Sequence, residues 1–388
     1  MTKFFPPQQQ PLLTRLLQSI ADLLTFAYHI KLEVSEEDIA LLRQLADRRV
    51  IYMPNHSNLD DGLVMFAFSA RLGQLFHYVV AHEAFQGWMG KLLQWVGAYS
   101  IRRGMGDRAS IMQTLNIIQQ PQSKLVLFPE GGCSYQNDTV MPFRSGGIEL
   151  AWKAMAKLNS GATSLSDLYL VPVSIKYYYR GNTTAQIARS LTELETALSI
   201  QPQTEEFYPR LRAIAQKILS NLETEYQVVT DHDSDWNQRI EILKQQLLDY
   251  CEQELQIAPA PQLPNRERVY KIQAILADLN ATESDLDSKY QHLQLTTVRL
   301  LNFDAIYDGY VADEPTPERF FATLDRLERE IFQIDRPKAK GLRHARVKIG
   351  TPINLLEYCA SESGDRQKLV TQLTQTIQQT VQTNLSCN

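Results

Sequence analysis

The stretch that decides the fold is RVIYMPNHSNLDDG, residues 49–62, in which a short apolar run gives way at once to polar residues. The apolar part is typical of a β-strand, and the polar part holds one histidine, two asparagines and two aspartates within residues 55–61. Two interpretations compete. Asn58 or Asp60 caps a helix that begins here, or His56 is a general base held by a carboxylate.

Similar apolar runs recur in the first half of the chain and alternate with segments of helical period. They are FHYVVA, AYSIRR, KLVLFPEG and LYLVPVSIKYYY. Strands that alternate with helices predict an α/β fold with functional loops at the strand ends. From about residue 183 the pattern is helical only, and a strand returns in ARVKIGTPI, residues 345–353, before a last helix at 364–384.

The economical organisation is one α/β domain with a large all-helical insertion. We predict that residues 1–182 form the domain, that 183–335 form the insertion, and that 336–388 supply a strand and a helix that complete the sheet. The insertion carries 27 acidic against 14 basic residues, whereas the whole chain has a net charge of −5, so the remainder is basic. This asymmetry of charge predicts different partners for the two parts. No internal repeat is evident.

Composition places the chain among soluble globular proteins, with 388 residues, 44% hydrophobic and 21% charged. The four cysteines lie far apart without metal-ligand spacing, which suits a reducing compartment and predicts no metal site. We see no secretory signal and no apolar run of about 20 residues that could span a bilayer. We therefore expect a cytoplasmic protein. No nucleic-acid-binding motif is present, so nucleic acid is not an expected partner.

Two segments are candidates for contact with a membrane surface. Residues 12–30 have leucines and isoleucines at three- and four-residue spacing, which predicts one amphipathic helix. Residues 336–348, RPKAKGLRHARVK, contain six Lys or Arg and no acid. Each segment also has a plainer interpretation: the helix packs on the domain's own core, and the basic run is a solvated junction.

His56 and Asp61 have the spacing that general-base chemistry needs. The strand brings His56 to its C-terminal end, and Asp61 lies in the first turn of the following helix, within reach of the imidazole. A carboxylate on one ring nitrogen fixes the tautomer and leaves the other nitrogen as a base, which is worth about 10²–10⁴-fold in rate. Such a pair removes the proton from an alcohol without any serine nucleophile. Alone, this spacing is also compatible with a capping turn.

Arginines and glycines follow two further strands. GAYSIRRG, residues 97–104, ends with Arg102 and Arg103, a pair suited to phosphate or simply solvated. LVLFPEGGCS, residues 125–134, runs into Glu130, Gly131 and Gly132, where backbone N–H groups can approach a ligand or merely form a turn.

A proline interrupts a later apolar run. In YLVPVSIKY, residues 169–177, Pro172 lacks an N–H and predicts a bulge or the start of a strand.

The order and separation of these elements resemble the four motifs of the glycerolipid acyltransferase family, which includes lysophosphatidic acid acyltransferases. The matching sequences are NHSNLDDG, GAYSIRR, FPEGG and VPV, within residues 45–180, together with the closing VKIGTPI. Each motif is loose by itself, but four in this order are specific. The resemblance implies that family's sheet flanked by helices.

The resemblance also implies roles for individual residues. His56 would deprotonate the hydroxyl of a glycerolipid acceptor, oriented by Asp61, and the oxygen would attack an acyl-CoA or acyl-carrier-protein thioester without an acyl-enzyme. Arg103, with Arg102 beside it, would bind the acceptor's phosphate. Glu130, Gly131 and Gly132 would help form the acceptor site, and Pro172 is linked to acyl-donor placement. No other cofactor is implied.

The chain departs from the family at one motif. After Phe-Pro-Glu-Gly the family commonly has Thr-Arg, and this chain has Gly132 and Cys133. The loss weakens the case for a phosphate-bearing acceptor, although Arg144 in MPFRSGG could compensate. Two alternatives to a thioester-dependent acyltransferase stay open: a phospholipid transacylase, and a lipid-binding or scaffolding relative without turnover.

Overall fold

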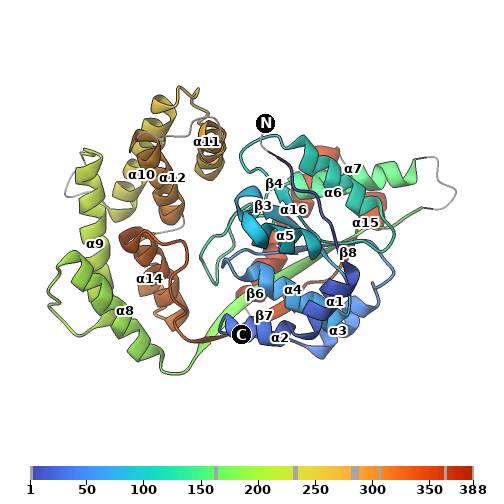
Figure 1. Cartoon of the computed structure of the whole chain (residues 1–388), viewed down its shortest axis with the longest axis horizontal. Helices are drawn as coiled ribbons and strands as arrows, with labels where there is room; N and C mark the ends of the chain where they lie inside the picture. The colour runs from blue at the N-terminus through green and yellow to red at the C-terminus, as the bar shows by residue number, and fades with distance from the viewer. Residues whose placement is uncertain are drawn as a thin grey trace. The chain divides into compact units, whose positions relative to one another are not determined.

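The structure is a computed structural model that describes residues 3–160, 165–229, 235–280, 288–304, 307–361 and 365–386. The chain forms two compact units (Figure 1). The sheet unit comprises Lys3–Arg102, Gly106–Tyr178 and Arg343–Asn388. The helical unit comprises Arg103–Met105 and Tyr179–Leu342, so its main segment begins four residues before the predicted insertion and ends seven residues after it.

The sheet unit contains a mixed sheet of eight strands, in the order β1-β7-β6-β2-β5-β3-β4 with β8 paired to β6. The strands are β1 (Ile30–Val34), β2 (Val50–Pro54), β3 (His77–Ala81), β4 (Ala98–Ile101), β5 (Lys124–Val126), β6 (Tyr169–Arg180), β7 (Leu342–Ile349) and β8 (Ile353–Asn354). β2 lies parallel to β5 and β6, and β3 lies parallel to β4 and β5, whereas β8 is antiparallel to β6. The returning strand β7 pairs in parallel with β1 and lies in the sheet between β1 and β6.

Helices cover both faces of this sheet. Those of the sheet unit are α1 (Pro11–Ser19), α2 (Ala21–Ala27), α3 (Glu36–Arg43), α4 (Asp61–Leu72), α5 (Gly87–Trp95), α6 (Arg108–Gln119), α7 (Gly146–Asn159), α15 (Leu355–Ser361) and α16 (Arg366–Ser386). Val50 and Tyr52 of β2 share a core with α4, and the alternating Ile51 and Met53 share the opposite core with α6, α7 and α16. Burial on both faces explains why this strand is apolar at every position.

The predicted single helix over residues 12–30 is wrong in two respects. It is broken at Ile20 into α1 and α2, and β1 begins at Ile30. Its orientation also differs from that of an ordinary surface helix. The buried side chains of α1 and α2 are polar or small, namely Thr14, Gln18, Ala21 and Thr25. Leu17 and Leu24 are half-buried against the core, whereas Leu12, Leu16, Ile20, Leu23 and Phe26 are exposed.

The helical unit contains α8 (Thr183–Leu198), α9 (Phe207–Glu225), α10 (Trp236–Glu254), α11 (Asn265–Asn280), α12 (Ser288–Phe303), α13 (Tyr310–Asp313) and α14 (Pro317–Phe332). Its core is a continuous apolar cluster contributed by these helices. Among the described residues of the chain, no helix is long and apolar enough to cross a membrane.

Three buried ion pairs recur at equivalent places in the helical unit, although the sequence shows no evident repeat. In each, a glutamate near the end of one helix binds a guanidinium near the start of the next helix through two hydrogen bonds. The pairs are Glu195–Arg210, Glu223–Arg239 and Glu252–Arg268, with N–O distances of 2.6–2.9 Å. Both partners of each pair are buried, so their charges cancel inside the unit, and the acidic surplus belongs to the other residues.

The basic run 336–348 is largely engaged within the fold. Lys340 is buried and binds Asp325 and Glu328, and Arg343 is buried and binds Asp60 at 2.7 Å. The run therefore presents fewer cations than its sequence suggests.

Candidate active site

His56 and Asp61 form a direct pair in the loop that joins β2 to α4. The Nδ1 atom of His56 lies 2.9 Å from Oδ2 of Asp61. The same oxygen accepts a hydrogen bond from the backbone N–H of Asn58 at 2.8 Å. Asp61 is the first residue of α4, where the helix dipole also favours a negative charge.

The capping alternative does not describe this loop. Asp60 is the N-cap residue of α4, but its side chain makes no capping hydrogen bond and binds Arg343. The side chain of Asn58 accepts from the N–H of Asp60 and so closes the turn before the helix. The carboxylate of Asp61 is directed at the histidine.

This pairing fixes which nitrogen of His56 can act as a base. A carboxylate at Nδ1 favours the tautomer in which Nδ1–H donates, and the lone pair then lies on Nε2. The His56 side chain is 20% exposed, whereas that of Asp61 is completely buried. The pair thus has a buried acid and an accessible ring, as general-base catalysis requires.

Tyr177 of β6 holds the other oxygen of Asp61. Its hydroxyl donates to Oδ1 at 2.6 Å. Burial raises the pKa of the Tyr177 hydroxyl well above its ordinary value, and the charge of Asp61 raises it further, so this group stays a donor. Asp61 thus receives hydrogen bonds from three groups and cannot rotate without losing them.

Glu130 positions the backbone of His56. Its Oε1 accepts from the N–H of His56 at 2.6 Å, and its Oε2 accepts from the N–H of Met141 at 3.1 Å. The residue is 2% exposed. The structure therefore shows a supporting contact for Glu130, and its predicted contact with an acceptor stays a prediction.

The loop after β5 completes the surroundings of His56. The carbonyl of His56 accepts from the N–H of Ser134 at 2.7 Å and from its hydroxyl at 3.1 Å. The ring of Phe128 lies 4.4 Å from the imidazole, centroid to centroid. Because β2 and β5 are parallel neighbours, their C-terminal ends place these loops at one edge of the sheet.

Two asparagine side chains extend the sheet beyond the end of β2. The amide of Asn55 pairs with the N–H and C=O of Ile175, and that of Asn137 pairs with the N–H and C=O of Tyr177, at 2.7–3.0 Å. These bonds replace a strand ladder and fix the loops that carry His56 and Ser134 against β6.

Gly131 lies against Arg144. The glycine has φ +73°, and a Cβ built on it would meet the guanidinium carbon of Arg144 at 2.7 Å. The N–H of Arg144 donates to the carbonyl of Pro129 at 2.9 Å. A guanidinium therefore lies beside the Phe-Pro-Glu-Gly turn although the sequence lacks an arginine at the usual place. Gly132 is buried in the same turn.

The two arginines after β4 fall in different units. Arg102 is half-buried in the sheet unit, and its N–H donates to Asp107 at 2.9 Å. Arg103 groups with the helical unit, where its guanidinium lies 4.4 Å from the centre of the Tyr270 ring. Binding of an acceptor phosphate by either residue stays a prediction.

Pro172 lies inside β6 and marks neither a bulge nor a strand start. The register to β2 runs without interruption through the pair Met53–Pro172, and the side chain is buried. Its carbonyl accepts from the N–H of Gly350 at 2.9 Å. The predicted link to the acyl donor is untested by this geometry.

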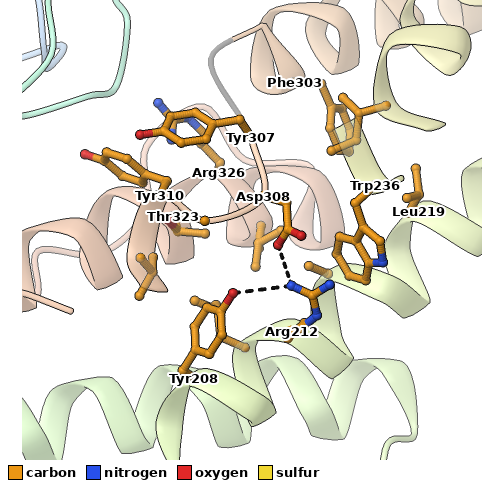
Figure 2. A pocket seen from close by; sticks show the side chains of 16 residues that line it. Tyr208, Arg212, Leu219, Trp236, Phe303, Tyr307, Asp308, Tyr310, Thr323 and Arg326 are labelled. Atoms are coloured by element: carbon orange, nitrogen blue, oxygen red, sulfur yellow. Dashed lines mark hydrogen bonds and ion pairs between the residues drawn. The ribbon is translucent and has the colours of Figure 1, made fainter. Parts of the chain in front are cut away.

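The helical unit has a pocket of its own, which contains none of the predicted site residues (Figure 2). Arg212, one of the lining residues, donates to the carboxylate of Asp308 and to the Tyr208 hydroxyl, the latter at 3.3 Å. Its guanidinium also lies 4.4 Å from the centre of the Trp236 ring. The pocket wall is mainly aromatic and aliphatic, and its charged side chains are Arg212, which is paired with Asp308, and Arg326. The pocket has no base of the kind seen at His56.

Among the described residues, no three His, Cys, Asp or Glu side chains are grouped to hold a metal ion. The sequence interpretation missed Tyr177, Asn55, Asn137 and Ser134. One signal was available for Tyr177. Strand alternation places it on the same face as Val173 and Ile175, the face that α4 covers.

A buried carboxylate that holds an accessible histidine, at the carboxyl edge of an α/β sheet, is an arrangement that can act as a general base. Comparison with known families agrees with this class. The family model described as Acyltransferase matches residues 31–176, the segment that carries His56, Asp61 and Glu130. The chain thus contains a domain of the glycerolipid acyltransferase family, like the lysophosphatidic acid acyltransferases. No curated protein matches the chain.

Proposed function

We propose that the sheet unit transfers a fatty acyl group from an acyl-CoA or acyl-carrier-protein thioester to the hydroxyl of a glycerolipid acceptor. The observation that carries the proposal is the 2.9 Å contact between His56 Nδ1 and the buried carboxylate of Asp61. It leaves Nε2 as the base for the acceptor hydroxyl. The acceptor oxygen then attacks the thioester carbonyl, the C–S bond breaks, and the thiolate leaves with the proton that His56 holds.

Arg144 supports an acceptor that carries phosphate. Its guanidinium lies beside the Gly131 turn, in the loop that contacts His56 through Phe128. Guanidinium groups bind phosphate through forked hydrogen bonds. We infer that Arg144 supplies the cation that the missing Thr-Arg would provide, together with Arg102.

Substitution of His56 tests the reaction. His56→Ala is expected to lower acyl transfer by about 10²–10⁴-fold while the protein stays folded. His29→Asn is the matched control, because His29 is exposed in the same unit and asparagine tolerates its φ of +56°. Full activity of His56→Ala would refute the proposal. Release of free thiol, followed with a chromogenic reagent, separates thioester-dependent transfer from transacylation between phospholipids.

Substitution of Arg144 tests the acceptor class. Arg144→Gln is expected to raise KM at least about tenfold for a lysophosphatidic acid acceptor and to leave KM for a monoacylglycerol unchanged. Equal effects on the two acceptors would show that Arg144 supports the turn and does not bind phosphate.

A further inference from the structure

Exposed large apolar side chains are concentrated on the first two helices of the sheet unit and on α5. Leu12 is 89% exposed, Leu16 63%, Leu23 65% and Phe26 64%. Leu12 and Leu16 lie four residues apart on α1, and Leu23 and Phe26 lie three residues apart on α2, so each helix has an exposed apolar side. These four side chains are termed the leucine stripe. On α5, Trp88 is 74% exposed.

This stripe cannot turn inward, because specific hydrogen bonds hold the opposite side of the helix. The Gln18 side chain donates to the Ser69 hydroxyl at 2.9 Å and to the carbonyl of Gln74 at 2.8 Å. The Thr14 hydroxyl lies 3.2 Å from the carbonyl of Trp95. A rotation of the helix that buried the exposed leucines would break these hydrogen bonds. The exposed leucines are thus a fixed feature of the fold.

The contact between Thr14 and Trp95 also joins the two parts of the surface. The N–H of Gln10 donates to the same carbonyl at 2.8 Å, so the start of α1 meets the end of α5. On α5, Trp88, Lys91 and Trp95 follow one another at three- and four-residue spacing and are exposed. Tryptophan and lysine are the side chains that favour the boundary between water and lipid headgroups.

The charges around this surface suit lipid headgroups. The only acidic residue of α1, α2 and α5 is Asp22, which is engaged by the Arg71 guanidinium at 3.0 Å through both of its oxygens. Arg15 and Lys91 are exposed cations on the same helices. Apolar side chains flanked by tryptophan and by a net positive charge complement a bilayer that contains anionic lipid.

We propose that α1, α2 and α5 are the surface by which this protein docks on the headgroup region of a lipid bilayer. The choice of a lipid partner rests on the proposed function, since a glycerolipid acceptor with long acyl chains resides in a bilayer. The leucine stripe enters the acyl boundary, and the tryptophans and Lys91 lie at the headgroups. The buried polar side of α1 and α2 keeps the helices attached to the sheet unit.

The test is flotation of the purified full-length chain with vesicles of equal parts phosphatidylcholine and phosphatidylglycerol. The wild type is expected to float with these vesicles. The triple variant Leu12→Gln, Leu16→Gln, Leu23→Gln is expected to lose at least about 100-fold in partition coefficient, since each leucine that leaves water contributes about tenfold. The matched control is Ile111→Gln, Met112→Gln, which removes two exposed apolar side chains of α6 in the same unit and should float like the wild type.

Three results would overturn the docking proposal. The first is a wild type that does not float with the vesicles. The second is a triple variant that floats like the wild type. The third is a wild type that forms oligomers in sedimentation and does not bind vesicles, together with a triple variant that is monomeric, because the leucines would then bind a second copy of the chain.

Activity with a short-chain lysophospholipid, dissolved as monomers, separates this proposal from the proposed function. The triple variant should keep acyl transfer to that acceptor. If the wild type floats but transfers no acyl group, the reaction is wrong and the docking surface stands. If it transfers acyl groups but does not float, the docking surface is wrong and the reaction stands.

Discussion

Removal of the Tyr177 hydroxyl is the sharpest test of how the His56–Asp61 pair is held. In Tyr177→Phe, the buried Oδ1 of Asp61 loses a donor at 2.6 Å and no water can replace it, because Asp61 is 0% exposed. Hydrogen bonds to charged groups are worth about 1.5–3 kcal/mol, so we expect the free energy of unfolding of the sheet unit to fall by about 2 kcal/mol.

The same substitution should slow the reaction. With one donor fewer, the Asp61 carboxylate can rotate away from Nδ1, and His56 loses part of the about 10²–10⁴-fold that a positioned base supplies. We expect kcat to fall about tenfold with KM nearly unchanged, because the Tyr177 side chain is buried.

Tyr52→Phe is the matched control, because it also removes the hydroxyl of a buried tyrosine. Tyr52 is also a fully buried tyrosine, on the neighbouring strand β2, and its hydroxyl has no hydrogen-bond partner among the residues that the structure describes. Its removal should change stability by less than about 0.5 kcal/mol or increase it. Urea unfolding followed by tryptophan fluorescence measures both variants. Equal losses of stability for the two variants, or an unchanged kcat for Tyr177→Phe, would refute this account of Asp61.

Three further predictions concern the same unit. Glu130→Gln keeps the side-chain shape but weakens the 2.6 Å bond to the N–H of His56, so kcat should fall at least about tenfold in initial-rate assays, whereas a change in KM alone would favour an acceptor-binding role. Gly131→Ala places a Cβ at φ +73° against a guanidinium and should cost about 1–3 kcal/mol in urea unfolding, whereas Gly62→Ala, which has open space in α4, should be neutral or stabilising. Burial lowers the pKa of His77, so the folded protein resists protonation while the unfolded chain binds a proton below about pH 6.5. Stability should therefore fall as the pH falls through that value, and His77→Gln should flatten the slope by up to about 1.4 kcal/mol per pH unit; an unchanged slope would contradict the assignment.

Local sequence patterns predicted the main features of the sheet unit. The alternation of short apolar runs with helical segments predicted an α/β sheet, and the isolated strand at 345–353 predicted a chain that returns to it; β7 does so beside β1. His56 and Asp61 are five residues apart, and their contact depends only on a strand that ends and a helix that begins between them. Contacts of this kind are determined by neighbouring residues, so the sequence reveals them.

Contacts between segments that are distant in the chain could not be predicted from the sequence. Tyr177 reaches Asp61 across 116 residues, and Glu130 holds the His56 backbone across 74. The sequence presents Glu130 as a carboxylate at a strand mouth, and only the fold shows that both its oxygens are used by backbone N–H groups. Hydrogen-bond partners of a buried carboxylate depend on which strands become neighbours, which local periodicity does not encode.

The first helices show the same division most clearly. By itself the sequence predicted one helix over residues 12–30 with an apolar side, because helical periodicity is a local property, and it missed the break at Ile20. Only the tertiary structure decided which stripe faces the protein. The hydrogen bonds of Gln18 to Ser69 and Gln74 hold the polar side inward, and Leu12, Leu16 and Leu23 face outward as a result. Burial depends on what the rest of the chain offers as a partner, and here Gln18 found polar groups whereas Leu17 and Leu24 packed against the core.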